Sequence, residues 1–276
     1  AHMAEALRLA ARGLYTTAPN PRVGCVIADG ERVLGRGFHE RAGEPHAEVF
    51  ALREAGDAAR GATAYVTLEP CAHHGRTPPC ADALVRAGVA HVVVAIGDPF
   101  DRVAGAGIVR LRDAGIAVDV GLMAAAAREL NTGFLSRIER GRPWVRVKLA
   151  TTLDGRTAPA DGSRLTITSA AAQRDGHRWR ARASAILTGV DTVLADDPQL
   201  TVRLDVPHTT PLRVIAERGA YTADGTPKNY SQLAAIQVGS LVAAGVVQWK
   251  ADAKAANGTD AGKALSQSIF TAGCNG

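Results

Sequence analysis

The sequence has little of several features that would define other classes of protein. Aromatic residues make up 4% of the chain, and its 4 cysteines in 276 residues are too few for the disulfide framework of a small secreted domain. No stretch reads as a membrane span or a signal peptide, and Lys and Arg form no long block although the net charge is +5. These absences predict a soluble cytoplasmic protein. Its mild basicity favours anionic small molecules over nucleic acid or a membrane.

The sequence does have enough apolar residues for buried cores. Hydrophobic residues are 46% of the chain, and a length of 276 residues favours two domains over one. Arg142-Pro143 follows a polar stretch and is the expected boundary. We therefore expect a first domain over 1–142, a second over 143–215 and a separate C-terminal segment over 216–276.

One imidazole and two thiols stand in a pattern typical of a catalytic zinc site. His46 and Glu48 form a His-x-Glu pair, and Cys71 and Cys80 each follow a proline. These three ligands suit zinc with an open position for water, and Glu48 is the expected carrier of protons to and from that water. Zinc deaminases use this pattern with P-C-x-x-C, whereas eight residues separate Cys71 from Cys80 here.

Local sequence places these ligands at the starts of helices. Pro45 is acceptable just inside a helix start, and Pro78-Pro79 precede an apolar-periodic run that stops at Gly88. The N–H groups and dipole of a helix N-terminus favour a thiolate. Two alternatives to a catalytic site stay open. One is a structural zinc site with His73 or His74 as the fourth ligand, and the other is a pair of buried cysteines without a metal.

The remaining pattern predicts an α/β fold with helices on both faces of a mixed sheet. Asp29-Gly30 is a hairpin signal between two strands. The elements expected in chain order are a helix over 4–13, strands over Cys25–Ala28, Val33–Phe38, Ala64–Leu68 and His91–Ile96, a helix over Gly107–Ala114, a buried strand over Trp144–Ala150 and a strand over Ser184–Val190.

Several motifs together resemble the bifunctional riboflavin-biosynthesis deaminase/reductase family. The matching stretches are Asn20–Gly24, Gly37–His39, Gly43–Glu48, Glu69–Cys71 and Pro79–Leu84. That family has the loop His-x-Gly-[Lys/Arg]-Thr-Pro-Pro between its cysteines, which accounts for the long spacing. The resemblance covers roughly residues 3–213. It implies a cytidine-deaminase-like α/β/α layered domain followed by a partial dihydrofolate-reductase-like α/β domain.

The resemblance also implies two reactions and a set of contacts. The first is zinc-dependent hydrolytic deamination of 2,5-diamino-6-(ribosylamino)-4(3H)-pyrimidinone 5′-phosphate, and the second is NADPH-dependent reduction of the ribosyl group to ribityl. A homo-oligomer is implied as well. The implied substrate contacts are Asn20, His39, His73 and Arg76 in the first domain and Lys148, Arg180, Leu200 and Arg203 in the second. Ala150, Thr166, Thr192 and Asp196 are implied to lie near NADPH.

The sequence departs from the family at several points. Arg164 stands where the family often has Ser, and Thr166 replaces a frequent Trp. The segment 216–276 has no match and is rich in Ala, Gly, Ser, Thr and Asn, which fits a truncated or frame-altered end and also a compact alternative ending. We therefore expect weak or absent reductase activity.

Two other functions are alternatives. A nucleoside or tRNA deaminase would be expected to show P-C-x-x-C spacing and, for RNA, a basic patch interleaved with aromatics. A non-catalytic zinc module would have no use for Glu48.

Overall fold

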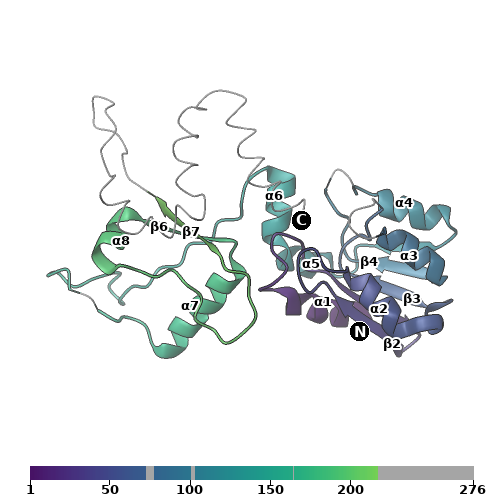
Figure 1. Ribbon diagram of the computed structural model, residues 1–276, viewed down its shortest axis with the longest axis horizontal. Coiled ribbons are helices and arrows are strands. Elements are labelled where there is room, and N and C mark those ends of the chain that lie inside the picture. Colours follow the sequence, from purple (N-terminus) through teal and green to yellow (C-terminus); the bar gives the residue numbers. More distant parts are fainter. Residues whose placement is uncertain (73–77, 101–102, 164, 217–276) are drawn as a thin grey trace, which may run out of the picture. The chain divides into compact units, whose positions relative to one another are not determined.

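The computed structural model describes residues 1–72, 78–100, 103–163 and 165–216 (Figure 1). The chain divides into two compact units, Ala1–Val147 and Lys148–Gly276. The expectations for His73, His74, Arg76, Arg164 and residues 217–276 fall outside the described residues. Among the described helices, none has the length and hydropathy needed to cross a membrane.

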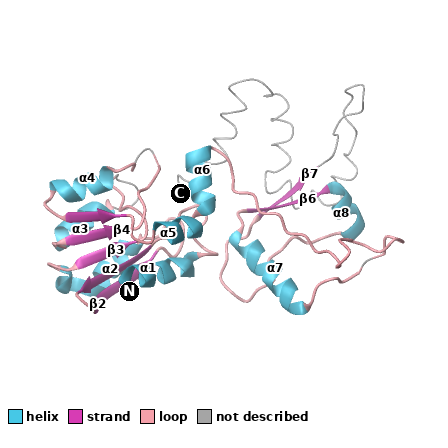
Figure 2. Cartoon of the chain, turned by 180° about the vertical axis from the view of Figure 1, so that it is seen from behind, coloured by secondary structure: helices cyan, strands magenta, loops and turns pink. Residues whose placement is uncertain are grey.

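The first unit is an α/β/α sandwich around a mixed sheet. Within the described residues the strand order is β2-β1-β3-β4-β5, in which β1 is antiparallel to both neighbours and β3, β4 and β5 are parallel. Figure 2 shows these strands between the helices. The strands are β1 (Gly24–Asp29), β2 (Arg32–Phe38), β3 (Thr63–Val66), β4 (His91–Val94) and β5 (Ala117–Val120). The helices are α1 (His2–Ala10), α2 (Ala47–Ala55), α3 (Cys80–Ala87), α4 (Ala106–Asp113), α5 (Ala124–Leu130) and α6 (Thr132–Arg140), with 3-10 turns at Ala11–Gly13 and Gly56–Ala59.

Alternate residues of β1 point to opposite faces of the sheet and pack into two cores. Cys25 and Ile27 belong to a core with α2, α3 and α4, whereas Val26 belongs to a core with α1, α5 and α6. The predicted mixed sheet covered on both faces is therefore confirmed. Helices α5 and α6 and strand β5 were not predicted from the sequence.

The structure confirms the predicted hairpin at Asp29-Gly30 and the predicted helix end at Gly88. Gly30, between β1 and β2, has a φ of +55°, and Gly88 ends α3 with a φ of +71°. Both are left-handed conformations that glycine adopts without a Cβ penalty.

Two glycines in β2 allow α2 to lie very close to the sheet. A Cβ on Gly35 would overlap the Ala51 carbonyl oxygen, and a Cβ on Gly37 would overlap that of Ala47. Since Ala47 is the first residue of α2, Gly37 determines how near the start of this helix approaches the sheet. This start is where the predicted His-x-Glu pair lies.

The described part of the second unit contains fewer helices and strands than the first unit. Its elements are α7 (Ala170–Arg182), β6 (Ala185–Gly189), α8 (Val190–Asp196) and β7 (Leu212–Ala216). Strands β6 and β7 are parallel, and the Ser169 side chain caps α7 by accepting from the Ala172 N–H. Strand β6 lies within the predicted 184–190.

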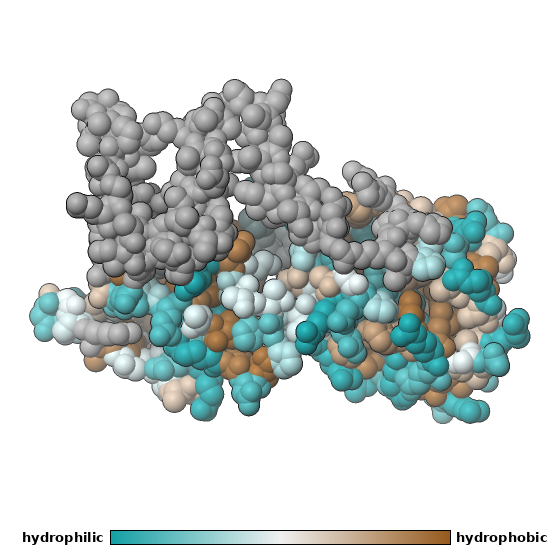
Figure 3. All heavy atoms as spheres, viewed as in Figure 1, coloured by the Kyte–Doolittle hydropathy of each residue, from teal (hydrophilic) through white to brown (hydrophobic). Residues whose placement is uncertain are grey.

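The predicted buried strand over Trp144–Ala150 is wrong for the described structure. No strand forms there, and Val145, Val147 and Leu149 are 75%, 76% and 75% exposed. An extended segment needs a neighbouring strand for its backbone N–H and C=O groups, and the described residues supply none. Figure 3 shows hydrophobic side chains at the surface of both units.

Candidate metal centre

His46, Cys71 and Cys80 come together in the first unit. Their ligand atoms, one per side chain, all lie within 4.8 Å of one another. The Nδ1 atom of His46 is 3.2 Å from the Cys80 sulfur and 3.6 Å from the Cys71 sulfur. Tetrahedral zinc with bonds of about 2.0–2.1 Å to nitrogen and 2.3 Å to sulfur separates its ligands by roughly 3.4–3.8 Å. The donor set and its dimensions therefore fit zinc.

Helix N-termini position the ligands, as the prolines indicated. His46 is the N-cap residue of α2, and Cys80 is the first residue of α3 after Pro79. The backbone N–H of Cys80 points to the Cys71 sulfur at 3.4 Å, and the N–H of Ala81 donates to the Cys71 carbonyl at 3.1 Å. The first turn of α3 thus supports Cys71 as well as supplying Cys80.

The electrostatics of the cluster favour an ion pair between Cys71 and His46. A hydrogen bond to Cys71 raises the pKa of His46 to about 9. Hydrogen bonding from the Cys80 thiol lowers the pKa of Cys71 to about 4, and that same bond, with burial, raises the pKa of Cys80. At neutral pH the three groups are then an imidazolium, a thiolate and a thiol, so a metal must displace two protons to bind all three.

Glu48 is a buried carboxyl group beside the cluster. It is 2% exposed, and its Oε2 atom has no hydrogen-bond partner among the described residues. Burial raises its pKa, while the charge of His46 opposes this. A buried carboxyl oxygen without a hydrogen-bond partner, next to metal-ligand side chains, is typical of a group that exchanges protons with a bound water or substrate.

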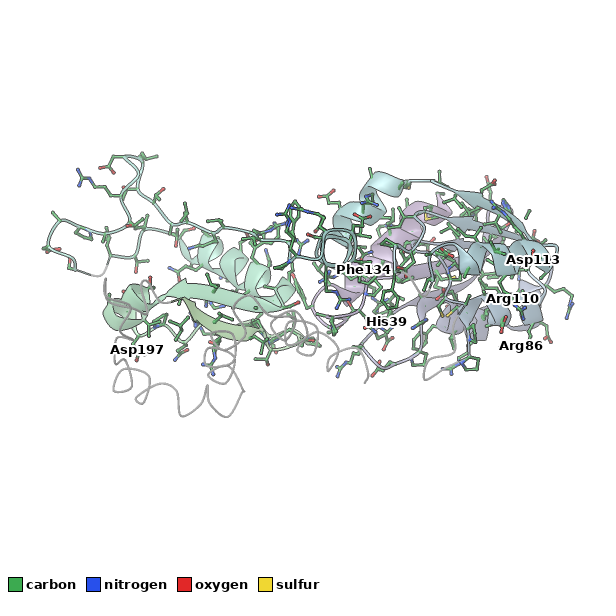
Figure 4. All side chains as sticks on the ribbon, turned by 90° about the horizontal axis from the view of Figure 1, so that it is seen from above. His39, Arg86, Arg110, Asp113, Phe134 and Asp197 are labelled. Carbon is green, nitrogen blue, oxygen red and sulfur yellow. The ribbon has the colours of Figure 1, made fainter. Side chains whose placement is uncertain are left out.

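His39 and Asn20 lie next to His46. The His39 ring, labelled in Figure 4, comes from the residue directly after β2 and meets the His46 ring edge-on with centroids 5.5 Å apart. Its Nδ1–H donates to the Pro45 carbonyl at 3.2 Å, and its Nε2 accepts from the Asn20 amide at 3.2 Å. Burial lowers the pKa of His39, so the ring is neutral in this arrangement.

Two buried residues near the site had no role assigned from the sequence. Asn131, fully buried, accepts from the Arg22 N–H at 2.8 Å and donates to the Arg22 carbonyl at 3.0 Å, which fixes the loop that contains Asn20. Glu69, 4% exposed, accepts backbone hydrogen bonds from the segment after β4. Asn131 has no sequence signal, because it is 109 residues from its partner. The position of Glu69 directly before Pro70-Cys71 was a signal that could have been used.

The second unit has a cavity of about 300 Å³. Four of the predicted contacts line it, namely Arg180, Asp196, Leu200 and Arg203, together with Asp197, Pro198 and Gln199. Asp197 is labelled in Figure 4. Burial, and then the charge of Arg203, lower the pKa of Arg180. Among the described residues, the lining does not include the other predicted contacts, which are Lys148, Ala150, Thr166 and Thr192.

Both units match known families. Residues 1–96 match the cytidine and deoxycytidylate deaminase zinc-binding region, and residues 143–229 match the RibD C-terminal domain. The fold and the His-Cys-Cys cluster therefore make the first unit similar to the zinc-binding region of cytidine and deoxycytidylate deaminases.

Comparison with individual proteins gives a more specific similarity than the family models. The riboflavin biosynthesis protein RibD of Escherichia coli strain K12 is 60% identical over 202 residues, covering 73% of this chain and 55% of that protein. Form 1 of Acinetobacter baumannii RibD is similar in structure with a TM-score of 0.76 and 53% identity, covering 81% of this chain and 65% of that one. A deaminase/reductase from Thermotoga maritima has a TM-score of 0.74 and 39% identity, covering 79% and 63%.

Over its matched residues the chain is similar to the riboflavin biosynthesis proteins named RibD. It spans about 55% of the length of the Escherichia coli relative.

Proposed function

We propose that the first unit catalyses the hydrolytic deamination of 2,5-diamino-6-(ribosylamino)-4(3H)-pyrimidinone 5′-phosphate. The observation that carries this proposal is the buried Glu48 carboxyl beside His46, Cys71 and Cys80, with one oxygen unpartnered among the described residues. A structural zinc site has no need of such a carboxyl group. A proton carrier next to an open metal position does.

The reaction replaces the 2-amino group of the pyrimidine by an oxygen from water. Zinc, when held by His46, Cys71 and Cys80, supplies a water that is acidic enough to react near neutral pH. Glu48 would accept a proton from the attacking water and pass it to the ring nitrogen, and would then pass the proton of the new C–OH group to the departing amine. The C–N bond breaks, and the products are ammonia and the corresponding uracil derivative. Burial raises the pKa of Glu48, which brings it toward the pH at which it must both accept and donate.

The substrate is held by groups around this centre. We assign Asn20 and His39 as contacts, because their hydrogen-bonded pair lies against the His46 ring. His73 and Arg76, which lie outside the described residues, are proposed as further contacts, with Arg76 suited to the phosphate.

Ammonia release from the diaminopyrimidine phosphate by the purified, zinc-loaded chain tests this function. The matched control is Glu48→Gln, which keeps the size of the side chain and removes its proton transfer. Cytidine, deoxycytidylate and tRNA are offered in parallel. Release from the diaminopyrimidine substrate alone supports the proposal. Release from cytidine or tRNA instead, or release that is unchanged in Glu48→Gln, contradicts it.

For the second unit we propose that the cavity binds the phosphate of the deaminated product and that NADPH-dependent reduction is weak or absent. Two guanidinium groups, Arg180 and Arg203, line one cavity and repel each other, which an anion would relieve. Of the four predicted NADPH contacts, however, Asp196 is the one that lines it. NADPH oxidation at ordinary enzyme rates with the deaminated product would overturn the second part. A cytoplasmic location and a homo-oligomer remain predictions.

A further inference from the structure

Glu69 is a buried carboxylate whose oxygens are both satisfied by backbone N–H groups. Oε1 accepts from Gly107 at 2.9 Å and from Ile108 at 3.2 Å. Oε2 accepts from Asp98 and from Gly105, each at 3.1 Å. The side chain is 4% exposed and four donors surround it. Burial of a charged group is unfavourable unless it is paired in this way, so the four bonds form one unit with the carboxylate.

These donors belong to the segment after β4 and to the first turn of α4. Gly107 and Ile108 are the second and third residues of α4, so the carboxylate caps the N-terminus of this helix from another strand connection. The backbone N–H of Glu69 also donates to the Ile96 carbonyl at 3.0 Å, two residues after the end of β4. Glu69 therefore links the start of the segment after β3 to β4 and α4.

The backbone directly after Glu69 is fixed at the same place. A Cβ on Gly107 would overlap the Pro70 carbonyl oxygen, and it would lie 3.2 Å from the Cγ atom of Glu69. The first turn of α4 thus holds Glu69 by its carboxylate and Pro70 by direct contact. Cys71, whose sulfur belongs to the metal-ligand cluster, is the next residue.

Cys71 is consequently held from two sides. On one side α3 donates to its carbonyl and sulfur through Ala81 and Cys80. On the other side the Glu69-Pro70 segment lies against α4. Helices α3 and α4 pack on the same face of the sheet. If the α4 side were released, α3 would be the remaining anchor, and the position of the Cys71 sulfur relative to His46 and Cys80 would be less well defined.

We propose that Glu69 is a positioning residue for the metal centre, which acts through Pro70 to place the Cys71 sulfur. The inference rests on the proposed zinc-binding role of the cluster and goes beyond it, because Glu69 is not one of the ligand side chains and both its oxygens accept backbone hydrogen bonds. When a residue that orients a metal ligand without contacting the metal is replaced, the metal affinity typically falls by about 10–100-fold.

Cobalt(II) and zinc titrations of the full chain test this proposal. Glu69→Gln is nearly the same size but puts an NH2 group where two N–H donors point. Its cobalt and zinc affinities should fall by about 10–100-fold. The thiolate-to-cobalt charge-transfer absorption should also weaken or shift, because it reports the sulfur geometry. Gly107→Ala should change the same readouts in the same direction by pushing on Pro70.

Two control variants separate positioning from general stability. Glu5→Gln removes a carboxylate of the same unit that pairs with Arg36, and Gly133→Ala adds a methyl group where nothing lies within 4 Å. Both should leave metal affinity and the cobalt spectrum unchanged. Thermal unfolding of each variant is recorded alongside, since a mere helix cap would lower stability without altering the spectrum.

The outcomes are distinguishable. If the parent chain binds neither cobalt nor zinc, the metal site itself is refuted. If the parent binds metal and Glu69→Gln binds it equally well with the same spectrum, the positioning role is refuted and Glu69 is a helix cap. Should Glu69→Gln fail to fold, Ile108→Pro decides by the same readouts. It removes one of the four donors in the first helical turn, where proline is tolerated.

Discussion

The protonation of the metal-ligand cluster predicts how zinc binding depends on pH. With the pKa of His46 at about 9, roughly 1% of the imidazole is neutral at pH 7, and its deprotonation costs about 3 kcal/mol. The Cys80 thiol must also lose a proton, because its pKa is raised. Cys71 is already a thiolate above about pH 4. Zinc binding should therefore release two protons, and the apparent Kd should fall about 100-fold for each unit that the pH rises.

Between about pH 5 and 6.5, the change of Kd with pH distinguishes this cluster from a site whose three ligands have ordinary pKa values. A histidine and two cysteines with ordinary pKa values would release between two and a half and three protons over roughly this range, so their Kd would change about sixteen-thousandfold across it. For the cluster of His46, Cys71 and Cys80, the Kd should change about a thousandfold over this range, because Cys71 releases no proton. A metal-coordinated water loses its proton nearer pH 7 and does not interfere at these lower pH values.

Calorimetry at pH 6 in buffers of different ionisation enthalpy counts the released protons directly. Competition with a chelator gives the Kd across the same range. Cys25→Ala is the matched control, because the Cys25 thiol is buried in the core and is not part of the cluster. Its proton count should equal that of the parent chain. A count of about 2.8 at pH 6, the value for ordinary pKa values, would refute the Cys71–His46 ion pair.

Three further variants test other parts of the structure. Glu48→Gln should keep the metal and reduce the deamination rate by about 10²–10⁴-fold, measured as ammonia release with parallel zinc analysis. Gly37→Ala should force α2 away from the sheet, because the new Cβ meets the Ala47 carbonyl. It should lower the free energy of unfolding by about 1–3 kcal/mol and weaken metal binding, whereas Gly133→Ala should do neither. Arg203→Ala should weaken the binding of inorganic phosphate to the second unit, measured by calorimetry, and an unchanged affinity would exclude the cavity as the site.

The metal-ligand cluster could be predicted from the sequence because metal chemistry restricts it to few residue types. An imidazole, two sulfurs and a carboxyl group in this order leave little choice, and prolines and glycines set the local helix boundaries. The hydrogen-bond partners of the supporting residues could not be predicted in the same way. Glu69 receives its hydrogen bonds from residues 29 to 39 positions away, and Asn131 pairs with a residue 109 positions away. Such partners depend on strand order, which local patterns do not contain.

The strand over Trp144–Ala150 illustrates the opposite case. The pattern predicted a buried strand there, yet Val145 and Val147 are exposed. A strand exists through its neighbours, and the pattern reports what the side chains prefer without supplying the hydrogen-bonding partner. Likewise, Gly35 and Gly37 appear in sequence as weak strand residues, and the close approach of α2 that requires them becomes visible in three dimensions.

The topology explains why these separate segments meet at one place. Strands β3 and β4 are parallel, and the chain after each leads to the starts of α3 and α4 at the carboxyl edge of the sheet. Since β1 is antiparallel to both β2 and β3, its amino end and the carboxyl end of β2 lie at that same edge. The Asn20 loop, His39, Cys71 and the N-terminus of α3 therefore lie at the same edge of the sheet.

The same topology separates the chemistry from the far ends of the helices. Arg86 lies in the last turn of α3 and Asp113 ends α4, and Figure 4 shows both, with Arg110, well apart from His39. The positive ends of the helix dipoles point to the edge that holds the thiolate, and basic side chains occupy the last turns of α3 and α4. We expect substitutions in those last turns to change helix stability alone, and substitutions of Gly107 or Cys80 in the first turns to change the metal centre. The direction of the helices relative to the sheet therefore decides which positions in this unit control the proposed chemistry.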